Sequence, residues 1–368
     1  MEQDVKTSVI KQWRGYKGRP YLIAGPCSAE SEEQVLETAK QVAALKETSV
    51  FRAGIWKPRT RPNSFEGVGV EGLKWLRTVK QETGLLVGTE VANEKHVYEA
   101  LKYGVDLLWI GARTSVNPFT VQEISNALNG VDVMVLVKNP INPDIELWVG
   151  AIERIARAGI TYLGAIHRGF SSYEKTTYRN QPNWQLPIEL RRRIPDLPII
   201  CDPSHIAGSR LYLHEISQKA MDLNFDGLMI ESHINPDKAL SDASQQLTPN
   251  DLRELLSRLI LRNPVASDPK VLDVLGELRQ QIDLYDEHLL DIMEQRMKVA
   301  ETIGAYKKEN NITILQSARW DEIMKKVVAK GVSKGLSAEV IDTIFKAIHQ
   351  ESINHQMKVM NNGIKKED

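Results

Sequence analysis

One stretch of this sequence gathers positive charge in a way that predicts anion binding. Four cations fall within ten residues, at Arg52, Lys57, Arg59 and Arg61, and the next carboxylate is Glu66. Burying unpaired charge is costly, so we expect a loop here and not a core strand. Such a loop suits phosphate or carboxylate groups held at defined positions. A solvated basic loop is the alternative if no other functional residues converge on it.

A second set of residues offers metal ligands. Cys27, His205, Glu231 and Asp242 supply one thiol, one imidazole and two carboxylates. This mixture suits a borderline divalent ion such as Mn²⁺, Fe²⁺, Co²⁺ or Zn²⁺, and does not suit Mg²⁺. Each residue alone has an ordinary interpretation, such as a buried cysteine or a loop histidine. The prediction therefore depends on all four converging.

Eight apolar runs, separated by polar loops and helical segments, predict the scaffold that positions these residues. Most of the runs lack alternation, as expected of parallel strands buried on both faces. Eight β/α units in about 240 residues predict an α/β fold, a (β/α)8 TIM barrel, and a doubly wound open sheet is the competing architecture. In a barrel the first, seventh and eighth strands, which carry the four metal ligands, are neighbours. The predicted strands are 21–27, 50–55, 85–91, 107–112, 133–138, 162–168, 197–202 and 227–232.

Further charged residues follow the other predicted strands, at the end of a barrel where active sites lie. Glu90 ends the third strand, Arg113 follows the fourth, Lys138 ends the fifth and Arg168 ends the sixth. Arg52, Lys57 and Arg59 bring the number of cations around one barrel mouth to six, and these repel one another without anions. We therefore predict substrates that carry two phosphates and a carboxylate. The run 191–193, three arginines, is predicted to lie on a solvated loop.

The spacing of apolar residues changes after the barrel, from β/α units to helices alone. A linker at 263–269 divides a predicted barrel domain at 1–262 from an all-α domain at 270–368. Thr248 and Pro249 are the predicted N-cap and first residue of the last barrel helix. Beyond the linker we expect one long helix to about 308 and two shorter helices, at about 317–330, stopped by Gly331, and 337–360. So thin a module is expected to dimerise in order to bury its apolar stripes.

Composition excludes several other classes of protein. The 368 residues are 42% hydrophobic and 26% charged, with a formal net charge of −1, which gives no general attraction to nucleic acid or to acidic membranes. No apolar run reaches the roughly 18 residues of a membrane helix, and no apolar segment near the N-terminus resembles a signal peptide. Two cysteines are too few for a disulfide scaffold, so we expect a cytoplasmic protein.

Five motifs, in order along the chain, resemble the type Iβ branch of the 3-deoxy-D-arabino-heptulosonate 7-phosphate (DAHP) synthases over about residues 15–262. This family condenses phosphoenolpyruvate with erythrose 4-phosphate on a divalent metal ion. The resemblance implies that Cys27, His205, Glu231 and Asp242 hold the metal ion, with Mn²⁺ expected first. The motifs are Gly25-Pro-Cys-Ser-Ala-Glu-Ser31, Lys57-Pro-Arg-Thr60, Gly111-Ala-Arg113, Asp202-Pro-Ser-His205 and Ile230-Glu-Ser-His233.

The resemblance also implies substrate contacts. Arg113 and Arg168 would bind the phosphate of phosphoenolpyruvate, Arg52 and Lys138 its carboxylate, and Lys57 would lie near the reacting carbons. Arg59 and Thr60 would bind the phosphate of erythrose 4-phosphate, and Glu90 is included among the substrate-binding residues. The alternative is a 3-deoxy-D-manno-octulosonate 8-phosphate synthase, which shares the barrel, the phosphoenolpyruvate site and the metal. That family usually has Ala-Asn in place of the Pro-Arg of the strand 2 loop, so the intact motif favours erythrose 4-phosphate.

The C-terminal helices resemble a chorismate mutase of the all-helical (AroQ) class, which rearranges chorismate to prephenate. Arg296 and Lys307 are eleven residues apart, so they lie roughly 20° apart around a helix and about 16 Å apart along it. The resemblance implies that cations hold the two carboxylates of chorismate, with Lys307 and Gln356 at its ether oxygen. Arg279 is expected to enter a partner subunit's site. The matching residues are Arg279, Arg296, Lys307, Arg319, Ser352 and Gln356.

Two positions depart from the mutase pattern. Trp320 follows Arg319 where the family usually has Glu, and Gln316 stands where an acidic residue is expected. We predict a bifunctional enzyme, a homodimer or larger, in which prephenate or chorismate bound to the helical domain inhibits the barrel. The alternative for the helical domain is a non-catalytic module for sensing and dimerisation.

Overall fold

The chain folds into two compact units, Met1–Pro264 and Val265–Asp368. The structure is a computed structural model, and it describes residues 5–57, 64–173, 176–315 and 317–361. The division between the units lies inside the segment 263–269.

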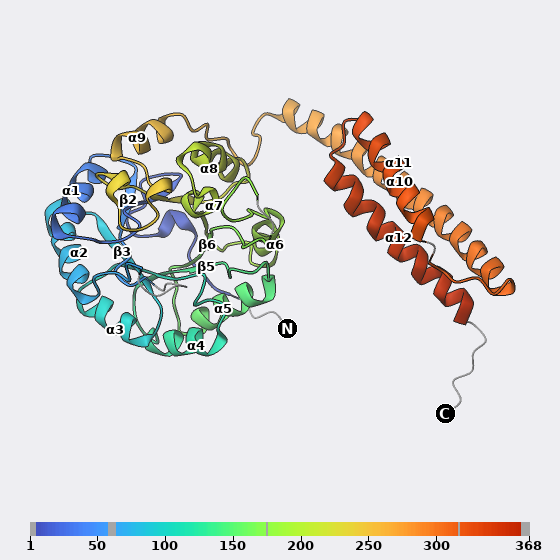
Figure 1. The fold of residues 1–368 in the computed structure, drawn as a ribbon. Coiled ribbons are helices and arrows are strands. Elements are labelled where there is room, and N and C mark those ends of the chain that lie inside the picture. Colours follow the sequence, from blue (N-terminus) through green and yellow to red (C-terminus); the bar gives the residue numbers. More distant parts are fainter. Residues whose placement is uncertain (1–4, 58–63, 174–175, 316, 362–368) are drawn as a thin grey trace. The chain divides into compact units, whose positions relative to one another are not determined.

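The first unit is a closed parallel barrel in which every strand pairs with the next and β1 pairs with β8 (Figure 1). The predicted fold class is confirmed, since all eight predicted strands are present and only their ends differ. The strands are β1 (Tyr21–Gly25), β2 (Thr48–Arg52), β3 (Leu86–Val91), β4 (Leu107–Ile110), β5 (Met134–Lys138), β6 (Leu163–His167), β7 (Ile199–Cys201) and β8 (Gly227–Glu231).

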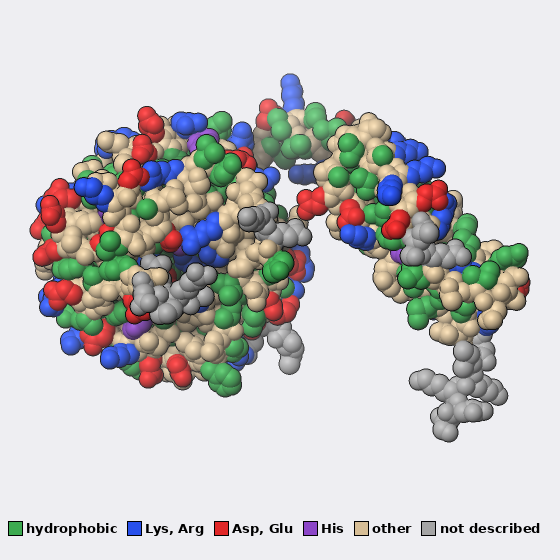
Figure 2. Space-filling view, viewed as in Figure 1, with side chains coloured by type: hydrophobic (Ala, Val, Ile, Leu, Met, Phe, Trp, Pro, Cys, Tyr) green, Lys and Arg blue, Asp and Glu red, His purple; other side chains and the backbone are tan. Residues whose placement is uncertain are grey.

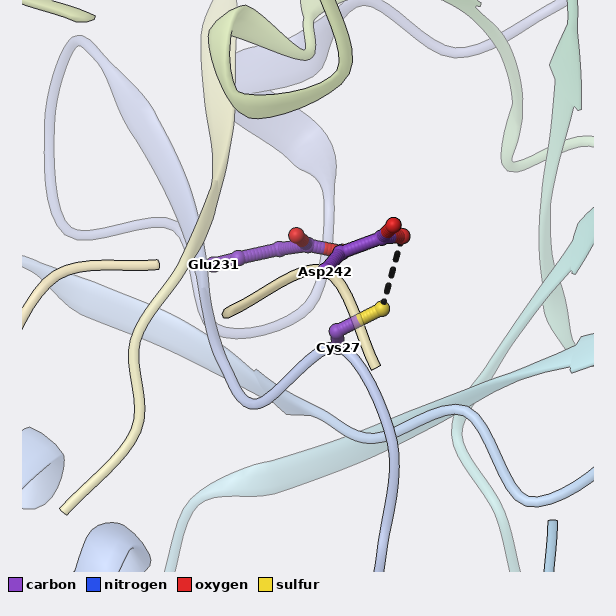
Figure 3. Close-up of side chains that lie close together, drawn as sticks. All are labelled: Cys27, Glu231 and Asp242. Atoms are coloured by element: carbon purple, nitrogen blue, oxygen red, sulfur yellow. Dashed lines mark hydrogen bonds between the residues drawn. The ribbon is translucent and has the colours of Figure 1, made fainter. Parts of the chain in front are cut away.

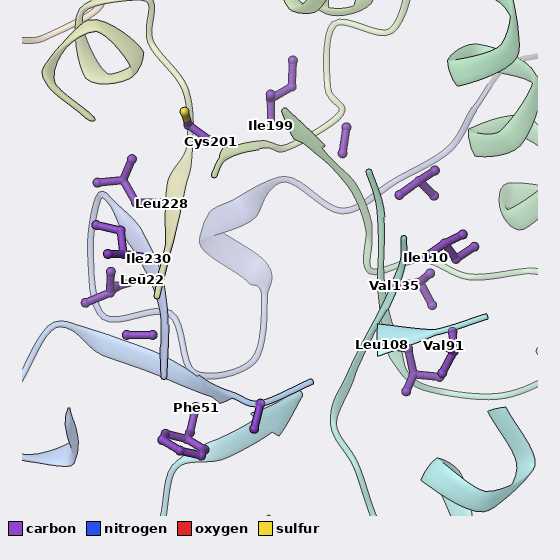
Figure 4. Packing of buried hydrophobic residues seen from close by; sticks show 14 of the residues in the cluster. Leu22, Phe51, Val91, Leu108, Ile110, Val135, Ile199, Cys201, Leu228 and Ile230 are labelled. Atoms are coloured by element: carbon purple, nitrogen blue, oxygen red, sulfur yellow. The ribbon is translucent and has the colours of Figure 1, made fainter. Parts of the chain in front are cut away.

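The strands are buried on both faces, which explains why their sequences do not alternate. Along β1, Tyr21 and Ile23 belong to a cluster inside the barrel, while Leu22 and Ala24 belong to the layer between strands and helices. Ile10 and Trp13 join the inner cluster, so the segment before β1 closes one end of the barrel. Figure 4 shows the outer layer, which includes Cys201, the core cysteine expected from the sequence.

Helices surround the strands, and several begin at side-chain caps that the sequence supplies. Thr248 caps the last barrel helix in a capping box with Asp251, and Pro249 is its first residue, as predicted. The helices of this unit are α1 (Glu32–Ala43), α2 (Val70–Thr83), α3 (Glu94–Lys102), α4 (Pro118–Ala127), α5 (Ile145–Arg157), α6 (Gln185–Arg193), α7 (Pro203–Ala207), α8 (Leu213–Asp222) and α9 (Pro249–Ser257).

The predicted loop at 191–193 is wrong, because these residues are helical, although Arg192 is exposed as expected of a solvated face. The three arginines form the last turn of α6, where cations interact favourably with the helix dipole. Arg191 lies 2.5 Å from a carboxylate oxygen of Asp226, and Arg192 and Arg193 both pair with Glu189. Charge on this helix is thus neutralised locally.

The second unit consists of α10 (Pro269–Glu309), α11 (Ser317–Ser333) and α12 (Ala338–Asn361). The prediction that Gly331 stops the second helix is wrong, because α11 continues to Ser333. A Cβ at Gly331 would lie 2.4 Å from Ile341 Cγ1, so this glycine permits close packing of α11 on α12. In the first half of α10, apolar side chains such as Leu275, Leu278, Ile282 and Leu289 remain exposed (Figure 2).

No helix among the described residues combines the length and the apolar character needed to cross a membrane.

Candidate functional sites

The four predicted metal ligands converge at the C-terminal ends of the barrel strands. Cys27 lies two residues beyond β1, Glu231 ends β8, His205 lies in α7, and Asp242 lies in the loop after β8. Cys27, Glu231 and Asp242 each offer a ligand atom within 4.8 Å of the others (Figure 3). His205 is not one of this group of three, but it lies at its edge, with Nε2 3.7 Å from Glu231 Oε1.

Neighbouring polar groups orient these side chains. Asp202 Oδ2 lies 2.8 Å from His205 Nδ1, so the other ring nitrogen faces the cluster. Gln245 Nε2 donates a hydrogen bond to Glu231 Oε2 at 2.7 Å, and Gln246 Oε1 accepts one from the Cys27 backbone N–H at 2.9 Å. Such outer contacts are typical of metal sites, where they fix the ligands.

The backbone of Asp242 adopts an unusual conformation. Its φ of 49° lies in the left-handed region, which costs free energy for a residue other than glycine. The Asp242 carboxylate accepts a hydrogen bond from Arg179 Nη1 at 2.9 Å, and Arg179 also contacts Gln245. Strained residues of this kind cluster at functional sites, where the surrounding structure holds them.

The electrostatics of the cluster favour anionic carboxylates, which the neighbouring arginines stabilise at all ordinary pH values and His205 stabilises only when it is protonated. Burial would raise the pKa of Asp242, but the neighbouring His205 and Arg179 outweigh it and hold this pKa well below its usual range. The pKa of Glu231 is also lowered, since His205 and Arg52 outweigh its burial. Burial lowers the pKa of His205. Neutral imidazole and ionised carboxylate are the forms that bind metal ions.

Cys27 behaves differently. Burial and the Glu231 carboxylate raise the pKa of its thiol to about 12, and Lys57 Nζ lies 2.9 Å from its sulfur. A divalent cation would reverse this by stabilising the thiolate. The donor set of one sulfur, one imidazole nitrogen and two carboxylates therefore fits a borderline divalent ion.

Most of the predicted cations surround the same barrel mouth. Arg52 is 1% exposed, its Nη2 lies 3.4 Å from Glu231 Oε1, and its carbon Cζ lies 4.9 Å from the centre of the Trp109 ring. Its Nε and Nη1 have no hydrogen-bond partner among the described residues. Two buried donors on one guanidinium are what an anionic ligand needs.

The other cations are held in different ways. Lys138 Nζ lies 2.9 Å from Asp202 Oδ2 in a buried pair. Arg168 donates to Asn180 Oδ1 at 2.9 Å, and its burial, with the charges of Arg179 and Arg113, lowers its pKa to about 10. Burial is the larger cause and the two neighbouring cations add to it, so a bound anion would stabilise the charged guanidinium of Arg168.

Four predicted barrel residues remain, and the structure describes two of them. Arg113 is exposed beside this cluster, and Glu90 accepts a hydrogen bond from Trp109 Nε1 at 2.9 Å. Arg59 and Thr60 lie outside the described residues. Sequence reasoning missed Arg179, Gln245 and Gln246, because nothing in a polar loop distinguishes residues that support a ligand from solvated ones. Asp202 stood in a motif, but its contact with His205 carries no sequence signal.

A second candidate site lies in the helical unit. A cavity of about 390 Å³ opens between α10, α11 and α12. It brings together five of the six predicted mutase residues, namely Arg296, Lys307, Arg319, Ser352 and Gln356. Arg279 does not line it, since it lies seventeen residues before Arg296 on the same helix, about 25 Å away. Its predicted place in a partner subunit's site stays a prediction.

The polar groups of this cavity are only partly satisfied. Arg296 donates to Ser352 Oγ, and Lys307 Nζ donates to the carbonyl of Ile314 at 2.5 Å. The buried Oε1 of Gln356 has no hydrogen-bond partner among the described residues. Trp320, the departure from the mutase pattern identified in the sequence, also lines the cavity, as does His349, which sequence reasoning did not place in a site. Gln316 lies outside the described residues.

Comparison with known proteins gives two family matches. Residues 4–261 match the profile described as "DAHP synthetase I family", and residues 278–357 match "Chorismate mutase type II". A phospho-2-dehydro-3-deoxyheptonate aldolase from Thermotoga maritima is 35% identical over 238 residues, covering 65% of this chain and 68% of that protein.

Two further relatives show how far the likeness extends. A 2-dehydro-3-deoxyphosphooctonate aldolase from Geobacter metallireducens is 30% identical over 256 residues, covering 65% of this chain and 90% of that protein. A crystal structure of the DAHP synthase from Thermotoga maritima superimposes with a TM-score of 0.61 at 32% identity, covering 74% of this chain and 75% of that one.

The donor set predicts that Cys27 is needed for metal retention. Protein loaded with Mn²⁺ and then dialysed should keep the ion in the wild type and lose most of it in Cys27→Ala, because the remaining donors lack the sulfur. Cys201→Ala is the matched control, since Cys201 lies in the core of β7 and should not affect metal content. Elemental analysis provides the measurement, and a full metal complement in Cys27→Ala would contradict the assignment.

Proposed function

Because this chain belongs to the DAHP synthetase I family and carries a chorismate mutase type II domain after its barrel, we propose that it is a bifunctional enzyme of the shikimate pathway. Its barrel would condense phosphoenolpyruvate with erythrose 4-phosphate to DAHP and phosphate. Its helical unit would convert chorismate to prephenate. The observation that carries the barrel proposal is the cluster of Cys27, Glu231 and Asp242 with the buried, unpartnered donors of Arg52 beside it.

In the barrel, a divalent ion held by Cys27, His205, Glu231 and Asp242, with Mn²⁺ proposed first, would supply Lewis-acid polarisation of the aldehyde oxygen. The buried donors of Arg52, together with Lys138, would orient the carboxylate of phosphoenolpyruvate. In this orientation its C3 would form a bond to the aldehyde carbon of erythrose 4-phosphate.

The phosphates would be bound by other residues. Arg168, a buried guanidinium whose pKa is lowered by burial and by the nearby charges of Arg179 and Arg113, would hold the phosphate of phosphoenolpyruvate together with Arg113. Arg59 and Thr60 would hold that of erythrose 4-phosphate. Lys57, 2.9 Å from the Cys27 sulfur, lies where it can donate a proton to oxygen near the reacting carbons. Water then adds at C2 of the former phosphoenolpyruvate, and phosphate leaves with the C–O bond electrons.

In the helical unit, the proposed rearrangement needs neither a nucleophile nor a cofactor. Arg296 and Arg319 would hold the two carboxylates of chorismate in its compact conformer, while Lys307 and Gln356 would face the ether oxygen. Positioning and electrostatic stabilisation are then the main catalytic contributions.

We further propose that the enzyme is at least a homodimer and that it resides in the cytoplasm. The exposed apolar side chains on the first half of α10 support a partner helix there, and Arg279 lies on this half. Two free cysteines support a reducing compartment.

We also propose that a ligand of the helical unit regulates the barrel. Fusion of a first pathway enzyme to a later one gives the later product a binding site on the same chain. Prephenate or chorismate bound to the helical unit would inhibit the barrel if it binds one arrangement of the protein more tightly than another.

Substrate choice tests the barrel activity. The Lys57-Pro-Arg-Thr60 motif favours a four-carbon aldose phosphate, so erythrose 4-phosphate should be consumed far faster than arabinose 5-phosphate in the presence of phosphoenolpyruvate and Mn²⁺. Phosphate release measures both reactions. A preference for arabinose 5-phosphate would place the barrel with the octulosonate branch.

Chorismate turnover tests the helical unit. Removing one desolvated charge contact typically costs about 2–5 kcal/mol, so Lys307→Ala should lower the rate of chorismate loss by about 30-fold or more. Lys298→Ala is the control, because Lys298 is exposed on the same helix and pairs with Glu294. Wild-type protein that binds prephenate without any turnover would instead establish a sensing module.

Cleaving the chain near Ala266 tests the regulation. Prephenate should inhibit DAHP formation by the intact enzyme and should lose this effect on the separated barrel, because the inhibitor's site lies on the other part. Initial rates with and without prephenate provide the comparison. A separated barrel that remains fully sensitive would exclude the helical unit as the sensor.

A further inference from the structure

The cavity of the helical unit contains a titratable group that the proposed reaction does not use. Among the described residues that line it, Arg296, Lys307 and Arg319 are cations, His349 carries an imidazole, and none carries a carboxylate. A cavity with three cations and no acid has a strongly positive potential, so it favours an anionic ligand.

The structure holds the His349 ring firmly. Its imidazole stacks on the indole of Trp320, with ring centroids 3.8 Å apart and planes 21° apart. His349 lies on α12 three residues before Ser352, on the same face of the helix, and Ser352 binds Arg296. The stack therefore connects α11 to α12 at the cavity wall.

Stacking uses the face of the imidazole and leaves its edge available. No described residue makes a hydrogen bond to either ring nitrogen of His349, and its titration is affected only by burial and by the charge of Arg296. Trp320 itself stands where the resembling mutases have a glutamate. The aromatic pair thus replaces an acidic group with a wall that can donate hydrogen bonds to a ligand.

We propose that His349 contacts the ligand of this cavity and takes up a proton when a dianion binds there. This inference rests on the mutase activity proposed above, since chorismate and prephenate are the dianions in question. It adds a proton-coupled step to binding at that same site.

The charges around His349 determine whether ligand binding raises or lowers its pKa. From α10 the cavity receives Arg296 and Lys307, and from α11 it receives Arg319, which pairs at 2.7 Å with Glu322 outside the lining. From α12 the other polar lining residues, Ser352 and Gln356, are neutral. Burial and Arg296 lower the pKa of His349 in the free protein, and a bound dianion would offset these cations and raise it.

Binding and protonation must therefore favour each other. The added affinity is fully present below the pKa of His349 in the free protein, and it is lost as the pH rises through the higher pKa of the complex. Between these two values, the affinity for the dianion should fall by up to about tenfold per pH unit, the limit for one proton.

Calorimetric titration of the full-length protein with prephenate tests this directly. Heats measured at one pH in two buffers of different ionisation enthalpy give the number of protons taken up. Wild type should take up a fraction of a proton near neutral pH, and His349→Gln, which keeps a hydrogen-bonding side chain but cannot titrate, should take up none. His355→Gln is the matched control, because His355 lies on the same helix, pairs with Glu301 and does not line the cavity.

Fluorescence provides a second readout, because Trp320 is the only tryptophan beyond the barrel. The difference in emission between wild type and Trp320→Phe should titrate with His349, and its midpoint should move to higher pH when prephenate is added. Equal proton uptake by wild type and His349→Gln would overturn the inference. If the wild type still turned over chorismate normally, the mutase proposal would nevertheless stand. Failure of the wild type both to bind prephenate and to turn over chorismate would overturn both.

Discussion

Acidic groups cannot share a buried space without compensation, and the barrel mouth is organised around this constraint. At an effective dielectric constant of 20, two unit charges 4 Å apart interact by about 4 kcal/mol. The positive charges of Arg52 beside Glu231 and of Arg179 beside Asp242 help to keep these carboxylates ionised despite burial, whereas the Cys27 thiol keeps its proton. Arg52 thus stabilises the cluster in addition to the role proposed for it in binding phosphoenolpyruvate.

Closure of the barrel is what assembles this cluster. Cys27 follows β1 and Glu231 ends β8, and these strands pair with each other at the point where Gly25 lies opposite Glu231. Residues from the two ends of a domain of about 260 residues meet only when the last strand joins the first. Local structure alone therefore cannot create the cluster, and the metal binding proposed for it would be a property of the folded barrel.

The parts of this protein that could be predicted from sequence are those with strong local patterns. Strands buried on both faces give apolar runs, and residues directly after such strands fall at one end of the barrel, which is why Cys27, His205 and Glu231 were found together. Arg179 and His349 carry no such pattern, since their contacts depend on how loops and helices meet. The interpretation of Gly331 as a helix stop failed for a related reason, because only the packing of Ile341 shows why glycine is needed there.

The left-handed backbone at Asp242 limits how this position can change during evolution. Such a conformation is tolerated mainly by glycine, asparagine and aspartate, because their side chains are absent or short and polar. A replacement by glutamate would keep the charge but lose the backbone preference, and a replacement by asparagine or glycine would keep the backbone preference but lose the charge. Aspartate is the amino acid that satisfies both demands, so drift at this position is constrained by the main chain as well as by chemistry.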